Sequence, residues 1–335
     1  MSPLSSSPES SRPAPPSGRG RSVFLFLIDF VGLLLVLLVL IGFFSFKSEH
    51  FWSFRTFSTL ANEIPSLTIV ATGMTFVLII AGIDLSVGSV LALGGAMIGL
   101  ALVNLQWPLW AGAALCLAVT ALCGLFNGLI SVRWTIPSFI VTLGMLEVAR
   151  GSAYLATQSQ TKYIGASIVS LGDPLPGVGF SPGFFAALAV VILGQLTLSL
   201  TRFGRYARAT GSNEPTARLC GISTGRVKVA VFALSGGLTG LASLFYCSRL
   251  ASADPNAGIG LELSAIAAAV IGGTSLMGGR GSVVNTFLGV LIIATLQTGL
   301  NQLSAPESVK RLVTGLVIVL AVIADSYRSR LMRKG

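Results

Sequence analysis

Between two long apolar runs the chain reads Arg202-Phe-Gly-Arg-Tyr-Ala-Arg-Ala-Thr-Gly-Ser-Asn-Glu-Pro-Thr-Ala-Arg-Leu-Cys-Gly-Ile-Ser-Thr-Gly-Arg-Val-Lys228. This basic stretch, residues 202–228, carries five Arg, one Lys and one Glu. Loops that join membrane spans are enriched in Lys and Arg on the cytoplasmic side. The stretch therefore predicts a polytopic membrane protein and identifies one of its cytoplasmic connections.

Composition supports this class of protein for the whole chain. Of the 335 residues, 53% are hydrophobic and only 10% are charged, and the mean hydropathy is +0.83. Soluble domains carry about 25% charged residues. Repeated apolar runs close to the ~20 residues that a helix needs to cross a bilayer favour helices over a barrel. We expect an all-α bundle of about ten transmembrane helices in the membrane lipid.

The apolar runs and the tails divide the chain into three parts. Residues 1–22, rich in Ser, Pro and Gly, predict a disordered cytoplasmic tail, and residues 327–335 predict a basic cytoplasmic tail. Between them, residues 23–326 form the membrane domain. Most Lys and Arg then fall on one side, which favours both termini in the cytoplasm. The expected crossings are 23–44, 62–82, 85–103, 109–132, 138–157, 184–200, 229–248, 263–276, 283–303 and 309–324.

A short helix is predicted inside the basic stretch. Asn213 is a typical N-cap, Glu214 and Pro215 suit a first turn, and Gly221 suits the end. Ala217, Leu219 and Cys220 would give this helix one apolar side. From the residues alone, a plain loop that only sets topology is the favoured interpretation, and a helix offered to a cytoplasmic partner is the alternative.

Two similar Gly-containing segments interrupt the apolar pattern. Ile79-Ile-Ala-Gly-Ile-Asp-Leu85 resembles Val270-Ile-Gly-Gly-Thr-Ser-Leu276, and a Gly-Ser-Val follows each. Duplicated broken segments of this kind point to a transport pathway. Asp84 with Ser86 is either a cap for the next helix, which the local pattern favours, or a solute or gate contact. The turn with Thr274 and Ser275 is either a moving part or a rigid turn.

Other polar residues in the spans carry open alternatives. Asn127 and Asn285 suit hydroxyl-rich solutes, but they serve equally to join neighbouring helices. Glu147 and Arg150, at i and i+3, are expected to pair with each other.

Several functions are excluded by missing patterns. The chain holds no phosphate-binding Gly-x4-Gly-Lys-Ser/Thr loop, no His-Glu-x-x-His and no Gly-x-Ser-x-Gly, so we expect no catalytic site, metal or cofactor. The basic residues lie at span ends, which argues against nucleic acid.

Several motifs together match a known family: Gly82-Ile-Asp-Leu-Ser-Val-Gly-Ser89, Ile136-Pro-Ser-Phe-Ile-Val-Thr-Leu-Gly144, Gly204-Arg-Tyr206 through Gly211 and Asn213 to Gly221-Ile222, and Ile271-Gly-Gly-Thr-Ser-Leu-Met-Gly-Gly-Arg-Gly-Ser-Val283. In this order they resemble the permease subunits of ribose-type ABC sugar importers, over about residues 25–330.

The resemblance implies a multi-pass subunit of the bacterial inner membrane that works by alternating access. It implies a cytoplasmic ABC ATPase, an extracytoplasmic sugar-binding protein and a second copy of the permease as partners. It reverses the preference for the basic stretch, which becomes the segment that docks on the ATPase, with Gly204, Arg205, Tyr206, Gly211, Asn213, Glu214, Ala217, Arg218 and Gly221 as its residues. The candidates for the translocation path or gate are Asp84, Ser86, Asn127, Thr274, Ser275 and Asn285.

Other functions remain open at this point. The cargo is a ribose- or xylose-like monosaccharide or another small solute, such as a nucleoside, a furanose signal or a branched-chain amino acid. A stand-alone secondary transporter needs coupling groups inside the spans, and only Asp84 qualifies. A membrane enzyme is disfavoured by the missing catalytic patterns.

Overall fold

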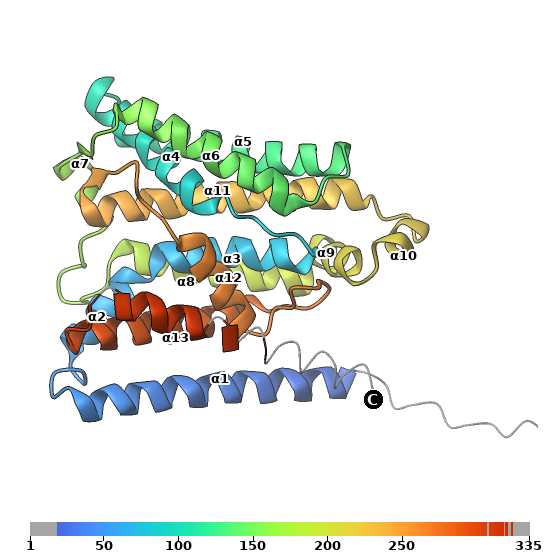
Figure 1. Ribbon diagram of the computed structural model, residues 1–335, viewed down its shortest axis with the longest axis horizontal. Coiled ribbons are helices and arrows are strands. Elements are labelled where there is room, and N and C mark those ends of the chain that lie inside the picture. Colours follow the sequence, from blue (N-terminus) through green and yellow to red (C-terminus); the bar gives the residue numbers. More distant parts are fainter. Residues whose placement is uncertain (1–18, 307, 318, 321–322, 324–335) are drawn as a thin grey trace, which may run out of the picture.

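The protein is a bundle of long helices lying side by side (Figure 1). The computed structural model describes the backbone of residues 19–306, 308–317, 319–320 and 323, and the side chains from Phe30 onward except where the backbone is not described. The first half holds α1 (Arg19–Lys47), α2 (Phe54–Glu63), α3 (Pro65–Ile79), α4 (Val87–Gly99), a π-helical turn (Leu100–Asn104), α5 (Leu109–Arg133) and α6 (Ser138–Thr157). The second half holds β1 (Lys162–Tyr163), α7 (Ala166–Val169), α8 (Pro182–Leu200), α9 (Arg202–Ser212), α10 (Glu214–Leu219), α11 (Thr224–Leu250), β2 (Ser252–Ala253), α12 (Leu261–Ile271) and α13 (Val283–Gln302).

The helical membrane fold is confirmed, whereas the count of about ten crossings is not. Within the described residues, seven helices are long and apolar enough to cross a membrane, or eight if α2 and α3, bent by 47°, form one span. The expected crossing at 263–276 becomes α12, which has 11 residues and a length of only about 17 Å. The apolar run was overestimated because Gly272 and Gly273 end the helix while the sequence stays uncharged to Leu276.

The two ends of the chain fall partly outside this description. Of the expected crossing at 309–324, residues 309–317, 319–320 and 323 are helical, and the remaining positions lie outside the described residues. The expected tails at 1–22 and 327–335 lie outside them too, except that α1 already begins at Arg19. The N-terminal end of α1 lies at the same end of the bundle as α9 and α10 (Figure 1). This arrangement agrees with a cytoplasmic N-terminus.

The centre of the bundle is built from α3 and α4, whose side chains are almost all buried. Around them, α11 packs closely on α5. A Cβ atom at Gly236 would overlap the carbonyl oxygen of Thr120, and one at Gly240 would overlap the hydroxyl of the same residue. Small residues of this kind allow two backbones to approach. The close approach expected at Gly236–Gly240 is therefore confirmed.

Candidate functional site

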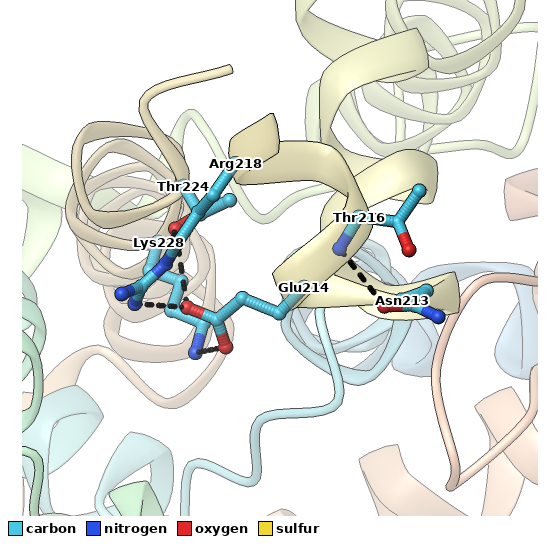
Figure 2. Close-up of polar contacts among 6 residues, drawn as sticks. All are labelled: Asn213, Glu214, Thr216, Arg218, Thr224 and Lys228. Atoms are coloured by element: carbon cyan, nitrogen blue, oxygen red, sulfur yellow. Dashed lines mark hydrogen bonds and ion pairs between the residues drawn. The ribbon is translucent and has the colours of Figure 1, made fainter. Parts of the chain in front are cut away.

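The helix predicted inside the basic stretch is present as α10. The side chain of Asn213 accepts a hydrogen bond of 3.0 Å from the Thr216 N–H (Figure 2), and Pro215 lies in the first turn. Gly221, at φ +79°, lies just beyond the helix. A left-handed residue at this place typically ends a helix and favours glycine. Cap, first turn and end all agree with the sequence prediction.

The carboxylate of Glu214 fastens α10 to the first turns of α11. Its Oε1 accepts hydrogen bonds from Arg218 at 2.7 Å and from the Thr224 hydroxyl at 3.1 Å, and its Oε2 accepts one from Lys228 at 2.5 Å (Figure 2). Arg218 also donates to the Thr224 hydroxyl at 2.9 Å. We call these four residues the Glu214 clamp. It confirms that Glu214 and Arg218 brace the helix, and it adds two partners from α11.

The clamp also determines the charge state of its carboxylate. Burial alone raises the pKa of Glu214, but the hydrogen bonds from Lys228, Arg218 and Thr224 and the positive charge of Lys228 outweigh it, so that its pKa lies below the ordinary value of 4.5. Hydrogen bonds and cations favour the charged form of a carboxyl group. Glu214 is therefore ionised at neutral pH, and both ion pairs are present.

The outer surface of α10 differs from the expected apolar side. Ala217 is buried, but Leu219 is 89% exposed and Cys220 is exposed. In a helix each residue turns by about 100°, so Leu219 points roughly 200° away from Ala217. Expecting Ala217, Leu219 and Cys220 on one side was wrong for this reason. The exposed surface around Leu219 combines one large apolar side chain with Arg218.

The segment before α10 reaches the helix breaks at one point. A Cβ atom at Gly211 would overlap the carbonyl oxygen of Ile79, the last residue of α3. The same oxygen accepts a hydrogen bond of 2.8 Å from the Gly279 N–H. We call Ile79, Gly211 and Gly279 the junction. It joins the end of α9, the end of α3 and the turn between α12 and α13.

The remaining residues expected in the docking segment lie on α9. Gly204 is buried against the end of α8, where a Cβ atom would overlap the carbonyl oxygen of Leu198. Arg205 and Tyr206 are exposed, and Arg205 makes a long contact of 3.4 Å with the Leu200 carbonyl oxygen.

Three of the six path candidates form one buried cluster. Asp84 accepts hydrogen bonds from the Ser86 N–H at 3.0 Å and from its hydroxyl at 2.6 Å, and Asn127 donates to that hydroxyl at 3.1 Å. Asp84 thus binds an N–H just before α4, as the cap interpretation expects. Ser86 itself makes no capping bond with its side chain. Asn127 joins α5 to this break, as the interhelical alternative expects.

The other three candidates lie around the second break. Thr274, Ser275 and Asn285 are all buried. Ser275 accepts a hydrogen bond of 3.2 Å from the Met277 N–H. The Thr274 hydroxyl and the side-chain oxygen of Asn285 have no hydrogen-bond partner among the described residues. Buried polar atoms normally find a partner, so these two are conspicuous.

The two similar segments end their helices in the same way. After α3, the N–H groups of Ala81 and Gly82 donate to Leu78 and Val77. After α12, those of Gly273 and Thr274 donate to Val270 and Ala269. Ala81 and Gly273 both have positive φ, at 58° and 79°, which completes a Schellman motif in each case. The shared geometry is displaced by one residue from the sequence match, and the two breaks meet at the junction.

A pocket of about 220 Å³ opens beside the first break and not at the path candidates. None of the six lines it. Its lining residues come from the end of α3, the α5–α6 turn and α11: Ile80, Ala81, Gly82, Ser131, Thr135, Ile136, Pro137, Ser138, Lys228 and Phe232. Lys228 therefore belongs both to this pocket and to the Glu214 clamp. Sequence analysis did not single out Lys228, Thr224 or Ile79, because their contacts are made to distant residues.

One predicted pair is absent. Arg150 donates to the carbonyl oxygens of Pro255 and Ala257, at 2.5 and 2.9 Å, instead of binding Glu147. The i, i+3 spacing allowed the pair, but the loop before α12 passes within reach and offers two carbonyl acceptors. In the described part of the chain, no three His, Cys, Asp or Glu side chains are placed to hold a metal ion.

Comparison with known proteins gives a consistent family. The model of the family described as branched-chain amino acid transport system / permease component matches residues 56–322. The chain belongs to this family of permease components. It is 39% identical to the ribose import permease protein of Haemophilus influenzae over 298 residues, 88% of this chain and 92% of that protein. It is 38% identical to the ribose import permease protein of Bacillus subtilis over 316 residues, 90% and 92% of the two chains. With the L-arabinose ABC transporter permease protein of Azospirillum brasilense it shares 33% identity over 330 residues, 98% and 96% of the two chains.

Proposed function

We propose that this permease carries a monosaccharide through the bacterial inner membrane as the membrane subunit of an ABC importer, with α10 as the helix that docks on a separate ATPase. The Glu214 clamp is the observation that supports docking most directly. It holds a short polar helix rigidly at the end of the bundle where the N-terminus also lies. The relatives named for ribose and L-arabinose support the sugar class.

Two partners complete this function. A cytoplasmic ATPase supplies the energy, and an extracytoplasmic binding protein delivers the sugar. The chemistry of the buried polar groups suits a neutral, hydroxyl-rich cargo. Thr274 and Asn285 hold oxygens without a partner, and such groups can exchange hydrogen bonds with sugar hydroxyls at no cost in charge. A ribose- or xylose-like pentose is the specific cargo we propose.

The proposed mechanism is alternating access driven through two rigid contacts. Movement of α10 reaches α11 through the Glu214 clamp. Movement of the end of α9 reaches both helix breaks through the junction. A displacement at a packed interface moves rigid elements together because packed cores deform little. The two contacts therefore give the ATPase a grip on the centre of the bundle.

Uptake by the reconstituted importer tests the function. The permease, its ATPase and its binding protein are placed in vesicles, and a panel of radiolabelled pentoses, hexoses, nucleosides and branched-chain amino acids is offered with and without ATP. We expect ATP-dependent uptake of one pentose above the rest. Uptake of an amino acid instead of any sugar contradicts the cargo, and uptake that does not require the ATPase contradicts the mechanism.

The junction gives a second, sharper test. Gly211→Ala adds a Cβ atom where the carbonyl oxygen of Ile79 lies, so the end of α9 must move away from both breaks. We expect uptake to fall by at least ~10-fold, because packed backbone has no room for a methyl group. The ATPase should still co-purify, because α10 is unchanged. Gly225→Ala is the matched control, since its new Cβ atom meets only the end of the Val132 side chain.

A further inference from the structure

A single carboxylate is exposed in the middle of a membrane-spanning helix. Glu147 belongs to α6, which runs along the edge of the bundle with α5 (Figure 1), and its side chain is exposed. It lies nine residues after Ser138, the first residue of this 20-residue helix. At 1.5 Å per residue it lies about 14 Å along a helix of about 30 Å. That depth is close to the centre of the hydrocarbon layer.

No neighbour within the described chain neutralises this group. Glu147 makes no hydrogen bond or ion pair with the residues that the structure describes. Arg150, one turn further along α6, donates to the carbonyl oxygens of Pro255 and Ala257 instead. A charged side chain in a span almost always faces the interior of a bundle or a water-filled cavity. An exposed, unpaired carboxylate at this depth is therefore poorly matched to lipid.

The surface around Glu147 has room for a molecule. Gly144 and Gly151 lie one turn before and one turn after it on the same exposed face. A Cβ atom added at either glycine would meet nothing within 4 Å. The carboxylate thus lies between two positions without side chains, with open space above both.

We propose that this face of α6 lines the solute path, and that Glu147 binds hydroxyl groups of the cargo in passage. Each carboxylate oxygen accepts hydrogen bonds, and a hydroxyl-rich solute supplies several donors. The proposal rests on the proposed function for the identity of the solute. The position of Glu147 at a water-filled surface can be measured without knowing the cargo.

Cysteine labelling tests that position. Glu147→Cys is made in a Cys220→Ser background, because Cys220 is the exposed native thiol. Leu193→Cys is the control, since Leu193 is 62% exposed near the middle of α8. Vesicles containing the complete importer are treated with a charged, membrane-impermeant methanethiosulfonate. Because only the thiolate reacts and it forms in water, we expect Glu147→Cys to react at least ~10-fold faster than Leu193→Cys. Equal rates at the two positions overturn the proposal.

Transport by two further variants tests the binding role. We expect Glu147→Leu to lower uptake at least ~10-fold and Glu147→Gln to lose less, because the amide keeps one acceptor oxygen. ATPase co-purification should stay unchanged in both. Wild-type uptake by Glu147→Leu overturns the proposal even if the labelling rates differ. If the wild type imports none of the sugars while Glu147→Cys is labelled rapidly, the proposed cargo fails and the path assignment stands.

Discussion

Glu214 and Glu147 are the same kind of side chain in opposite circumstances. Glu214 lies at the polar end of the bundle and accepts hydrogen bonds from Arg218, Thr224 and Lys228. Glu147 lies at mid-depth in α6, with no such partner among the described residues. Water could solvate Glu214 without any of its contacts, whereas hydrocarbon cannot solvate Glu147. The contacts of Glu214 therefore serve to position a helix, and the lack of contacts at Glu147 indicates a partner outside the chain.

Reversing the charge of Glu214 should have the largest effect on this comparison. In Glu214→Lys a third cation faces Arg218 and Lys228, so the clamp is lost and replaced by repulsion. Hydrogen bonds to charged groups contribute about 2 kcal/mol in total here, after allowing for the exposure of Arg218, which corresponds to roughly 30-fold weaker ATPase binding. Co-purification and a binding titration measure it.

The control for that variant restores the opposite charge. Glu214→Lys combined with Lys228→Glu rebuilds the pair between α10 and α11, and we expect it to recover part of the ATPase binding. Insertion into the membrane should be unchanged in both, because the clamp lies outside the spans. If Glu214→Lys binds the ATPase as tightly as the wild type, then α10 does not need the clamp, and the contrast with Glu147 loses its basis.

Acid should release the same clamp without any mutation. Because the pKa of Glu214 is lower in the folded protein than its ordinary value of 4.5, the stabilisation is fully present above that value and is lost as the pH falls through the lower folded pKa. We expect a spin label on Cys220, at the end of α10, to stay immobile from pH 8 to about pH 5 and to become mobile below the ordinary carboxyl pKa.

Glu214→Gln separates this group from others that titrate in acid. Its label should already be more mobile at pH 7 and should lack the additional step below the ordinary carboxyl pKa. An identical acid transition in both proteins would show that another group controls α10.

Local signals in the sequence predicted much of this molecule, and non-local contacts account for what they missed. Asn213, Pro215 and Gly221 predicted α10 correctly because caps and turns depend on neighbours within a few residues. Lys228 could not be assigned to Glu214, because the chain must first turn back at Gly221 for the two to meet. The junction is less accessible still: Ile79, Gly211 and Gly279 come from three separate parts of the chain.

The errors in the membrane region have a similar origin. Hydropathy does not register that Gly272 and Gly273 end a helix, so α12 was expected to be longer. Spacing alone suggested that Glu147 pairs with Arg150, but the loop at Pro255 and Ala257 supplies acceptors that no local pattern reveals. That single misassignment hid the exposed carboxylate on which the path assignment depends.

The smallest effect is expected at the cap of α10, which contributes to the same helix as the clamp but through one neutral bond. Asn213→Ala removes the acceptor for the Thr216 N–H, and losing a cap of this type costs about 1 kcal/mol, or roughly 5-fold in equilibrium terms. We expect ATPase binding to weaken by no more than that factor, with the Cys220 label slightly more mobile. Asn213→Asp keeps an acceptor oxygen and should bind like the wild type. A loss from Asn213→Ala as large as that from Glu214→Lys would mean that Asn213 contacts the ATPase itself, and α10 would then owe its position to the partner and not to the clamp.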